Sequence, residues 1–118
     1  MGDGAVYELK PPASSGGEWT FTVLKNFGKQ VNPIVPLVIQ GGNLYGGIAT
    51  AEGGAIFEIE PPSAPGGAWT TTYLHQWTDG QVPFGGIAVD KDGTIFGTTG
   101  SIFSSPPYTG TIFRITAR

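Results

Sequence analysis

The chain has 118 residues, of which 13% are charged, and its net charge at pH 7 is −3. An acidic chain with a pI near 4.8 has no basic stripe to neutralise phosphates, so nucleic acid is not an expected partner. The absence of cysteine excludes disulfides and thiolate metal sites and leaves the redox compartment open. No apolar run approaches the ~20 residues that span a bilayer, so membrane insertion is not expected, and no signal peptide is recognised.

The sequence repeats itself at a spacing of about fifty residues. Residues 4–27 return as 54–77, and eleven of the 24 aligned pairs are identical. Residues 54–59 return again as 110–115, after a loop at 100–109 that is five residues longer than its counterpart. A repeat of this length indicates one supersecondary unit copied along the chain, each copy needing neighbours to bury its apolar faces.

Each unit is expected to contain four short strands, which we call first to fourth. The first strand is expected at 35–40 and 85–90, and the second at 43–49 and 94–99. The third strand is expected at 4–10, 54–60 and 110–116, and the fourth at 18–27 and 68–77, so the chain begins with a third strand. Gly, Asn and Asp at 40–43 and 90–93 supply the positive φ angles that hairpin turns require. Pro-Pro at 11–12 and 61–62, followed by Gly-Gly, predicts exposed loops between third and fourth strands.

The two first strands differ from the others in their pattern. Residues 35–40 and 85–90 are almost continuously apolar, which predicts strands buried on both faces. No helical periodicity is visible anywhere in the chain.

A four-stranded unit of this size is typical of a β-propeller blade, in which blades surround a central channel. The predicted fold class is therefore all-β, with about two four-stranded, propeller-like blades in a single domain over residues 1–118. The predicted repeat units are 4–53 and 54–109, followed by a partial third unit at 110–118.

The combined pattern also resembles a known family. Residues 4–12 (GAVYELKPP), 16–20 (GGEWT), 42–46 (GNLYG) and 92–99 (DGTIFGTT) resemble the tandem repeats of bacterial surface or secreted proteins labelled as GloVer-repeat, propeller-like proteins. The resemblance implies a propeller and a secreted or cell-surface setting, and it transfers no catalytic residue. The chain departs from these proteins by its shortness and by Gly47-Ile48 where the second copy has Thr98-Thr99.

Two blades are too few to close a propeller, which typically needs four to eight. Self-association would supply the missing blades, so we expect a homo-oligomer in which a trimer or tetramer closes a ring. The alternative is that the chain belongs to a longer array. In a closed ring the third strand would be supplied twice, by 4–10 and by 110–116, and the sequence does not resolve this.

Three charged residues occupy the same position of the repeat. These are Glu8, Glu58 and Arg114. If they faced a channel, their mixed charges could form ion pairs or hold a polar ligand; the alternative is a solvated strand face. Two carboxylates could also serve a glycosidase, but the repeat explains the pair without catalysis.

Aromatic residues are the other candidates for ligand binding, because an apolar ring with a polar edge stacks on sugars. Trp77 belongs to a repeated position, where packing between blades is the alternative role. Phe103 and Tyr108 lie in the enlarged loop, and added loops on a rigid scaffold often carry function.

No residue pattern predicts catalysis or a cofactor. His75 is the single histidine and has no orienting acid with a matching signature. Residues 90–93 resemble the start of a calcium loop but lack its remaining ligands, so a turn is expected there. The expected function is a non-catalytic binding module for a carbohydrate or a protein. The alternatives are a structural blade pair without a ligand of its own, and an enzyme that uses the channel mouth.

Overall fold

The structure is a computed structural model in which residues 3–101 and 110–116 are described. These residues form ten β-strands and no helix, which confirms the all-β class. In chain order the strands are β1 (Asp3–Lys10), β2 (Thr20–Lys29), β3 (Asn32–Gln40), β4 (Asn43–Ala49), β5 (Gly54–Glu60), β6 (Thr70–Gln76), β7 (Gln81–Val82), β8 (Ile87–Val89), β9 (Ile95–Ser101) and β10 (Thr111–Ile115).

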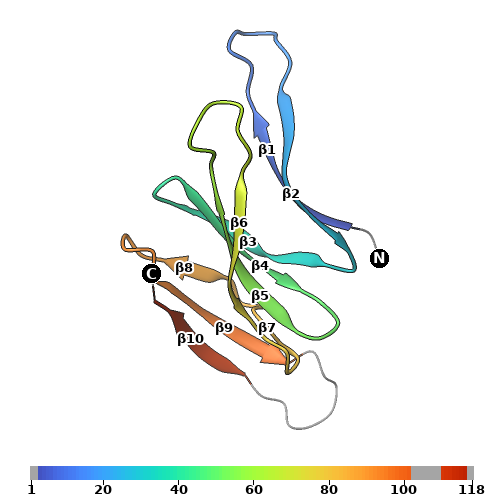
Figure 1. Cartoon of the computed structure of the whole chain (residues 1–118), viewed down its shortest axis with the longest axis vertical. Helices are drawn as coiled ribbons and strands as arrows, with labels where there is room; N and C mark the ends of the chain where they lie inside the picture. The colour runs from blue at the N-terminus through green and yellow to red at the C-terminus, as the bar shows by residue number, and fades with distance from the viewer. Residues whose placement is uncertain (1–2, 102–109, 117–118) are drawn as a thin grey trace.

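The strands form three antiparallel sheets (Figure 1). The hairpin sheet consists of β1 and β2, and the central sheet has the order β3-β4-β5-β6. In the C-terminal sheet, β9 pairs with β10 on one edge and with the short strands β7 and β8 elsewhere.

The central sheet has the strand order expected for one repeat unit. Its first hairpin turns at Gly41 and Gly42, whose φ angles of 62° and 85° suit a two-residue type I′ turn. Its last two strands are joined by the exposed loop that begins with Pro-Pro at 61–62, as predicted.

The hairpin sheet matches β5 and β6 in its strand register. Tyr7 lies opposite Val23, and at the corresponding positions Phe57 lies opposite Tyr73. Both pairs follow a register shift directly before the aromatic residue, between Val6 and Tyr7 in one sheet and before Phe57 in the other. Similar sequence thus produces the same irregular pairing twice.

The C-terminal sheet departs from the prediction at its first strand. We expected a strand over 85–90, but β8 covers Ile87–Val89 and a further strand, β7, pairs with the other end of β9. The physical reason is the Gly85-Gly86 pair: Gly86 has a φ of 84°, which interrupts an extended strand. The strand expected at 35–40 begins earlier, at Asn32.

The prediction that both first strands are buried on two faces is wrong. In β3, Ile39 is 71% exposed and Leu37 is 43% exposed. Both lie on the face of the central sheet that contacts the hairpin sheet, as shown by the pairing of Ile39 with the core residue Leu44. The hairpin sheet has two strands, and these do not extend over β3 far enough to cover its apolar residues.

Two apolar cores join the three sheets, and we call them the first and second junctions. At the first junction, residues of the hairpin and central sheets pack together: Val6, Leu24, Phe27, Val31, Leu44, Ile48, Ala55, Phe57, Ile59 and Trp69. At the second junction, residues of the central and C-terminal sheets pack together: Tyr45, Ile56, Leu74, Trp77, Ile87, Val89, Ile95, Phe113 and Ile115.

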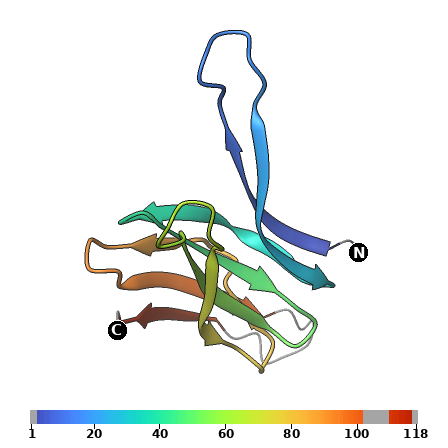
Figure 2. The same ribbon diagram turned by 45° about the horizontal axis from the view of Figure 1, so that its top comes forward.

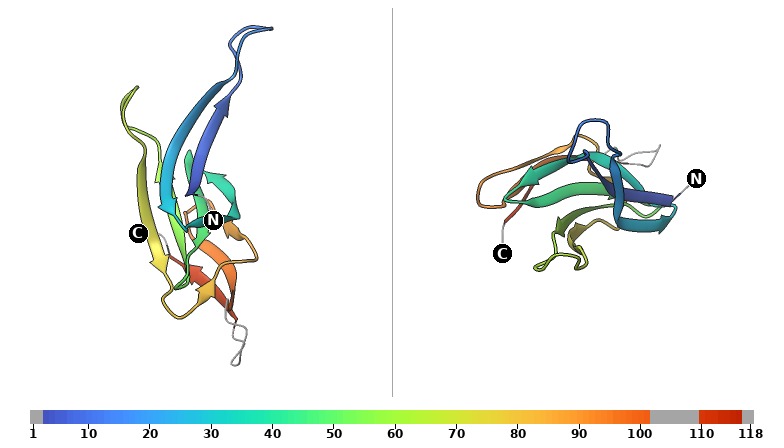
Figure 3. Two further views of the ribbon diagram at one scale, coloured as in Figure 1. Left: turned by 90° about the vertical axis from the view of Figure 1, so that its right-hand side faces the viewer. Right: turned by 90° about the horizontal axis from the view of Figure 1, so that it is seen from above.

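The molecule is elongated, measuring 55 × 35 × 24 Å. Its radius of gyration is 15.9 Å, whereas a compact domain of this length would have about 13.5 Å. The difference arises because the hairpin sheet projects away from the other two sheets (Figures 2 and 3). The described chain does not close into a barrel or a propeller ring.

Candidate functional site

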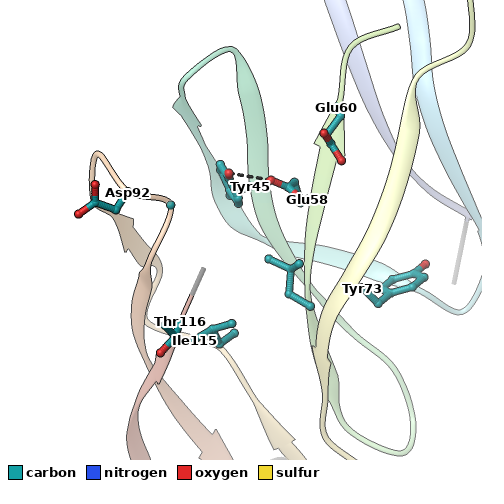
Figure 4. A pocket seen from close by; sticks show the side chains of 9 residues that line it. Tyr45, Glu58, Glu60, Tyr73, Asp92, Ile115 and Thr116 are labelled. Atoms are coloured by element: carbon teal, nitrogen blue, oxygen red, sulfur yellow. Dashed lines mark hydrogen bonds between the residues drawn. The ribbon is translucent and has the colours of Figure 1, made fainter. Parts of the chain in front are cut away.

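A polar groove lies where the central sheet meets the C-terminal sheet, at the edge of the second junction (Figure 4). Its volume is about 420 Å³. Its lining residues come from both sheets and from the turn between β8 and β9: Tyr45, Glu58, Glu60, Tyr73, Leu74, Asp92, Gly93, Ile115 and Thr116.

A hydrogen-bonded cluster forms the wall of the groove on the central sheet. The Tyr45 hydroxyl donates to Glu58 Oε2 at 2.7 Å, and Asn43 Nδ2 donates to the same oxygen at 3.2 Å. The pairing of β4 with β5 places Tyr45 directly opposite Glu58, so the backbone register fixes this contact. Burial, and then the hydrogen bond to the Glu58 carboxylate, raises the pKa of Tyr45 above its usual 10.0.

The opposite wall includes the turn at residues 90–93. The Asp90 carboxylate accepts hydrogen bonds from the backbone N–H groups of Asp92 and Thr94 at 2.9 and 3.0 Å. Gly93 completes the turn with a φ of 84°. The prediction of a turn is confirmed, and the described residues contain no group of three or more His, Cys, Asp and Glu side chains able to hold a metal ion.

The groove is rich in hydrogen-bond acceptors. Glu58, Glu60 and Asp92 bring three carboxylates to it, and none of the described lining residues is a Lys, Arg or His. Ionised carboxylates act as acceptors only, so a matching ligand must supply donors such as hydroxyl or amine groups. Leu74 and Ile115 add apolar surface beside them.

The structure distributes the three repeat-related charged residues over three sheets. Glu58 lies half-buried in the groove. Glu8 lies on β1, where its carboxylate is 4.0 Å from the Lys10 ammonium. Arg114 is exposed on β10 and does not line the groove. Of the three residues, Glu58 alone is therefore placed in the candidate site.

Trp77 lies in the second junction. Its ring is 5.2 Å from the Phe113 ring and 4.6 Å from the His75 ring, in edge-on geometry in both cases. Its partly buried side chain also borders a smaller hollow of about 280 Å³. Phe103 and Tyr108, the other two aromatic candidates, lie outside the described residues.

Sequence reasoning missed most of the groove as a unit. The sequence predicts a turn at Asp92, and it does not single out Tyr45 as a partner of Glu58. One signal was available: Asn43 and Tyr45 are two residues apart on one strand, as are Glu58 and Glu60 on the next, so each pair shares a sheet face.

Comparisons with family models, curated proteins and solved structures found no match to this chain. The resemblance to GloVer-repeat proteins therefore stays a prediction. Among the described residues, no helix is long and apolar enough to cross a membrane.

Proposed function

We propose that this chain is a non-catalytic, propeller-type binding module whose groove takes a neutral, hydroxyl-rich ligand of the oligosaccharide class. The observation that carries the proposal is the cluster in which Tyr45 and Asn43 hold one oxygen of Glu58 beside two further carboxylates. Such a cluster is rigid, and rigid polar groups bind with a smaller loss of conformational entropy.

The chemistry of the groove favours a carbohydrate over an anionic ligand. Sugar hydroxyls donate to carboxylates, while the C–H face of a sugar ring packs on apolar side chains such as Leu74 and Ile115. Three carboxylates without a lining cation would repel an anionic ligand. Because the groove is open, we expect dissociation constants of about 0.1–1 mM for a single site.

Binding without catalysis is supported by the state of the polar groups. The raised pKa of Tyr45 keeps its phenol protonated at neutral pH, and its proton points to Glu58. The His75 ring packs edge-on against Trp77 and does not line the groove. Neither group is placed as a base for a ligand in the groove.

The propeller-type arrangement is supported by the packing of successive sheets. The central sheet has the blade order, and both junctions place the third strand of one sheet against the preceding sheet. A structural role without a ligand is the second candidate, favoured by the large apolar side chains exposed on the outer sheets.

The test is a screen of neutral oligosaccharides on a glycan array, followed by titration of the ¹⁵N-labelled chain with each hit. We expect amide shifts around Tyr45, Glu58 and Gly93. Replacing Glu58→Gln removes the charged acceptor and should weaken binding about 10–100-fold, as for a lost charge-assisted hydrogen bond. The matched control is Glu18→Gln, in the exposed loop after β1, which should leave affinity unchanged.

Two results would count against the proposal. One is a screen without any hit at millimolar ligand. The other is a bound ligand whose affinity is the same for the Glu58→Gln and Glu18→Gln variants, which would place binding outside the groove.

A further inference from the structure

The two junctions between sheets are built from equivalent residues of the repeat. Phe27 of the hairpin sheet lies 5.1 Å, ring to ring, from Phe57 of the central sheet. At the positions fifty and fifty-six residues later, Trp77, directly after β6 of the central sheet, lies 5.2 Å from Phe113 of the C-terminal sheet. The chain thus forms one kind of contact twice, between the rear face of one sheet and the front face of the next.

We call the face of a sheet that packs on the next sheet along the chain its rear face. In the central sheet the rear face carries Ile56 and Tyr45, which are 0% and 5% exposed. Their counterparts in the C-terminal sheet are Ile112 and Phe96. There the same positions are 87% and 44% exposed, because no described sheet follows.

The front face of a sheet carries Phe57 and Ile59 in the central sheet, where they are 1% and 0% exposed. Their counterparts in the hairpin sheet are Tyr7 and Leu9, which are 58% and 51% exposed. The ring of Phe21 packs on Tyr7 at 5.4 Å and extends this apolar front face.

The exposed rear face of the C-terminal sheet is bordered by a hollow. This depression of about 510 Å³ is lined mainly by apolar residues, including Phe96 and Ile112 of the C-terminal sheet and Pro36 and Val38 of β3 in the central sheet. A surface of this kind receives apolar side chains of a partner more readily than a flat one.

We propose that the exposed rear face of one copy packs on the exposed front face of a second copy, head to tail. This third junction would have the same arrangement as the two internal ones. On its rear face, Ile112 and Phe96 would occupy the positions of Ile56 and Tyr45. On its front face, Tyr7 and Leu9 would occupy the positions of Phe57 and Ile59. The proposal is independent of the ligand groove, since Ile112, Phe96, Tyr7 and Leu9 do not line it.

A second copy is the occupant that the chain itself specifies. Each exposed face is one half of a contact whose other half lies on the opposite end of the same molecule. Two different faces give a heterologous contact, which closes into a ring when the rotation per copy allows and otherwise grows into a linear chain. A two-stranded sheet is also marginally stable alone and gains from a covered front face.

The test uses light scattering coupled to size exclusion over a range of concentrations. The mass of the native chain should exceed 12.3 kDa, at a fixed multiple of that mass if the ring closes and rising with concentration if it does not. The variants Ile112→Glu and Tyr7→Glu each remove one face, and each should stay at the monomer mass. An equimolar mixture of the two keeps one intact pair of faces and should form a dimer of one copy of each, and nothing larger.

The matched control is Ala64→Glu, in the exposed loop after β5, which should assemble as the native chain does. Circular dichroism checks that each variant folds, and Phe96→Glu with Leu9→Glu provides a second pair. Each face variant should weaken self-association at least about tenfold.

Three outcomes would overturn the proposal. A native chain that stays monomeric shows that a second copy does not cover these faces. A Tyr7→Glu variant that still dimerises shows that the rear face pairs with itself. A mixture of the Ile112→Glu and Tyr7→Glu variants that stays monomeric shows that the head-to-tail contact does not form.

Discussion

The contact of Phe57 with Gly46 offers a sharp test of how the central sheet packs. The two residues are paired across β4 and β5. A methyl group built on Gly46 would lie 2.6 Å from Cζ of Phe57 and 2.9 Å from Cδ2 of Leu37. Because carbon atoms in contact prefer about 3.5–4.0 Å, the Phe57 ring would have to retreat by about 1 Å. The ring is 1% exposed, so it has little space for that movement.

The expected cost of Gly46→Ala follows from two opposing terms. Overpacking a core destabilises the folded state by about 1–3 kcal/mol. Replacing glycine lowers the conformational entropy of the unfolded chain, which stabilises the fold by about 0.4–1 kcal/mol. The net loss of unfolding free energy is therefore about 1–2 kcal/mol. With an unfolding entropy of about 2.1 cal/mol/K per residue over 118 residues, Tm should fall by about 4–8 °C.

Thermal unfolding followed by circular dichroism measures this shift. The control is Gly100→Ala on β9, where the new methyl would lie 3.1 Å from a ring carbon of Phe84. Phe84 is 55% exposed and can move, so the Tm of the Gly100→Ala variant should differ from that of the native chain by less than about 2 °C. Adding Phe57→Leu to Gly46→Ala removes the clash with the ring, which is the closer of the two contacts, and the two changes should then cost less together than the sum of their separate effects. A Gly46→Ala variant as stable as the native chain, or strict additivity in the double variant, would refute the reasoning.

Three further predictions concern single side chains. Folding raises the pKa of Tyr45, so the stability that this shift provides is fully present below about pH 10 and is lost as the pH rises through the raised value. In urea titrations, the unfolding free energy of the Tyr45→Phe variant should therefore fall less between about pH 9 and pH 11 than that of the native chain. Trp77→Ala should lower the unfolding free energy by about 2–4 kcal/mol, because it removes the ring that packs on Phe113; an unchanged urea midpoint would assign Trp77 a surface role. Thr99→Val removes the 2.6 Å hydrogen bond to the buried Gln81 amide and should cost about 1–3 kcal/mol by the same titration, with a neutral result arguing against this contact.

The strands of the central sheet could be predicted well because their signals are local. The Gly41-Gly42 turn and the loop that starts at 61–62 bracket β4 and β5, and both strands have their predicted bounds. The strand β7 gave no such signal. It has two residues and is held in part by the hydrogen bond between Gln81 and Thr99, which are 18 positions apart.

The candidate site could be predicted only in part. Glu58 was identified from its place in the repeat, but the groove around it depends on how two sheets stack. Asp92 and Thr116 reach the groove from the C-terminal sheet and its turn, far along the chain from Tyr45. Periodicity along one strand shows which side chains share a face, and it does not show which turn of another sheet will stand beside that face.

The alternation of sheets and junctions has a consequence for how the molecule opens. Stability in such a stack is a sum of nearest-neighbour terms. The central sheet packs in both junctions and is held by two terms, whereas each outer sheet is held by one, and the hairpin sheet also has the fewest strands. Amide hydrogens should therefore exchange with solvent fastest in β1 and β2 and slowest in β4 and β5. Partial unfolding would begin at the projecting hairpin and stop at the central sheet, which makes the middle of the chain the last part to open.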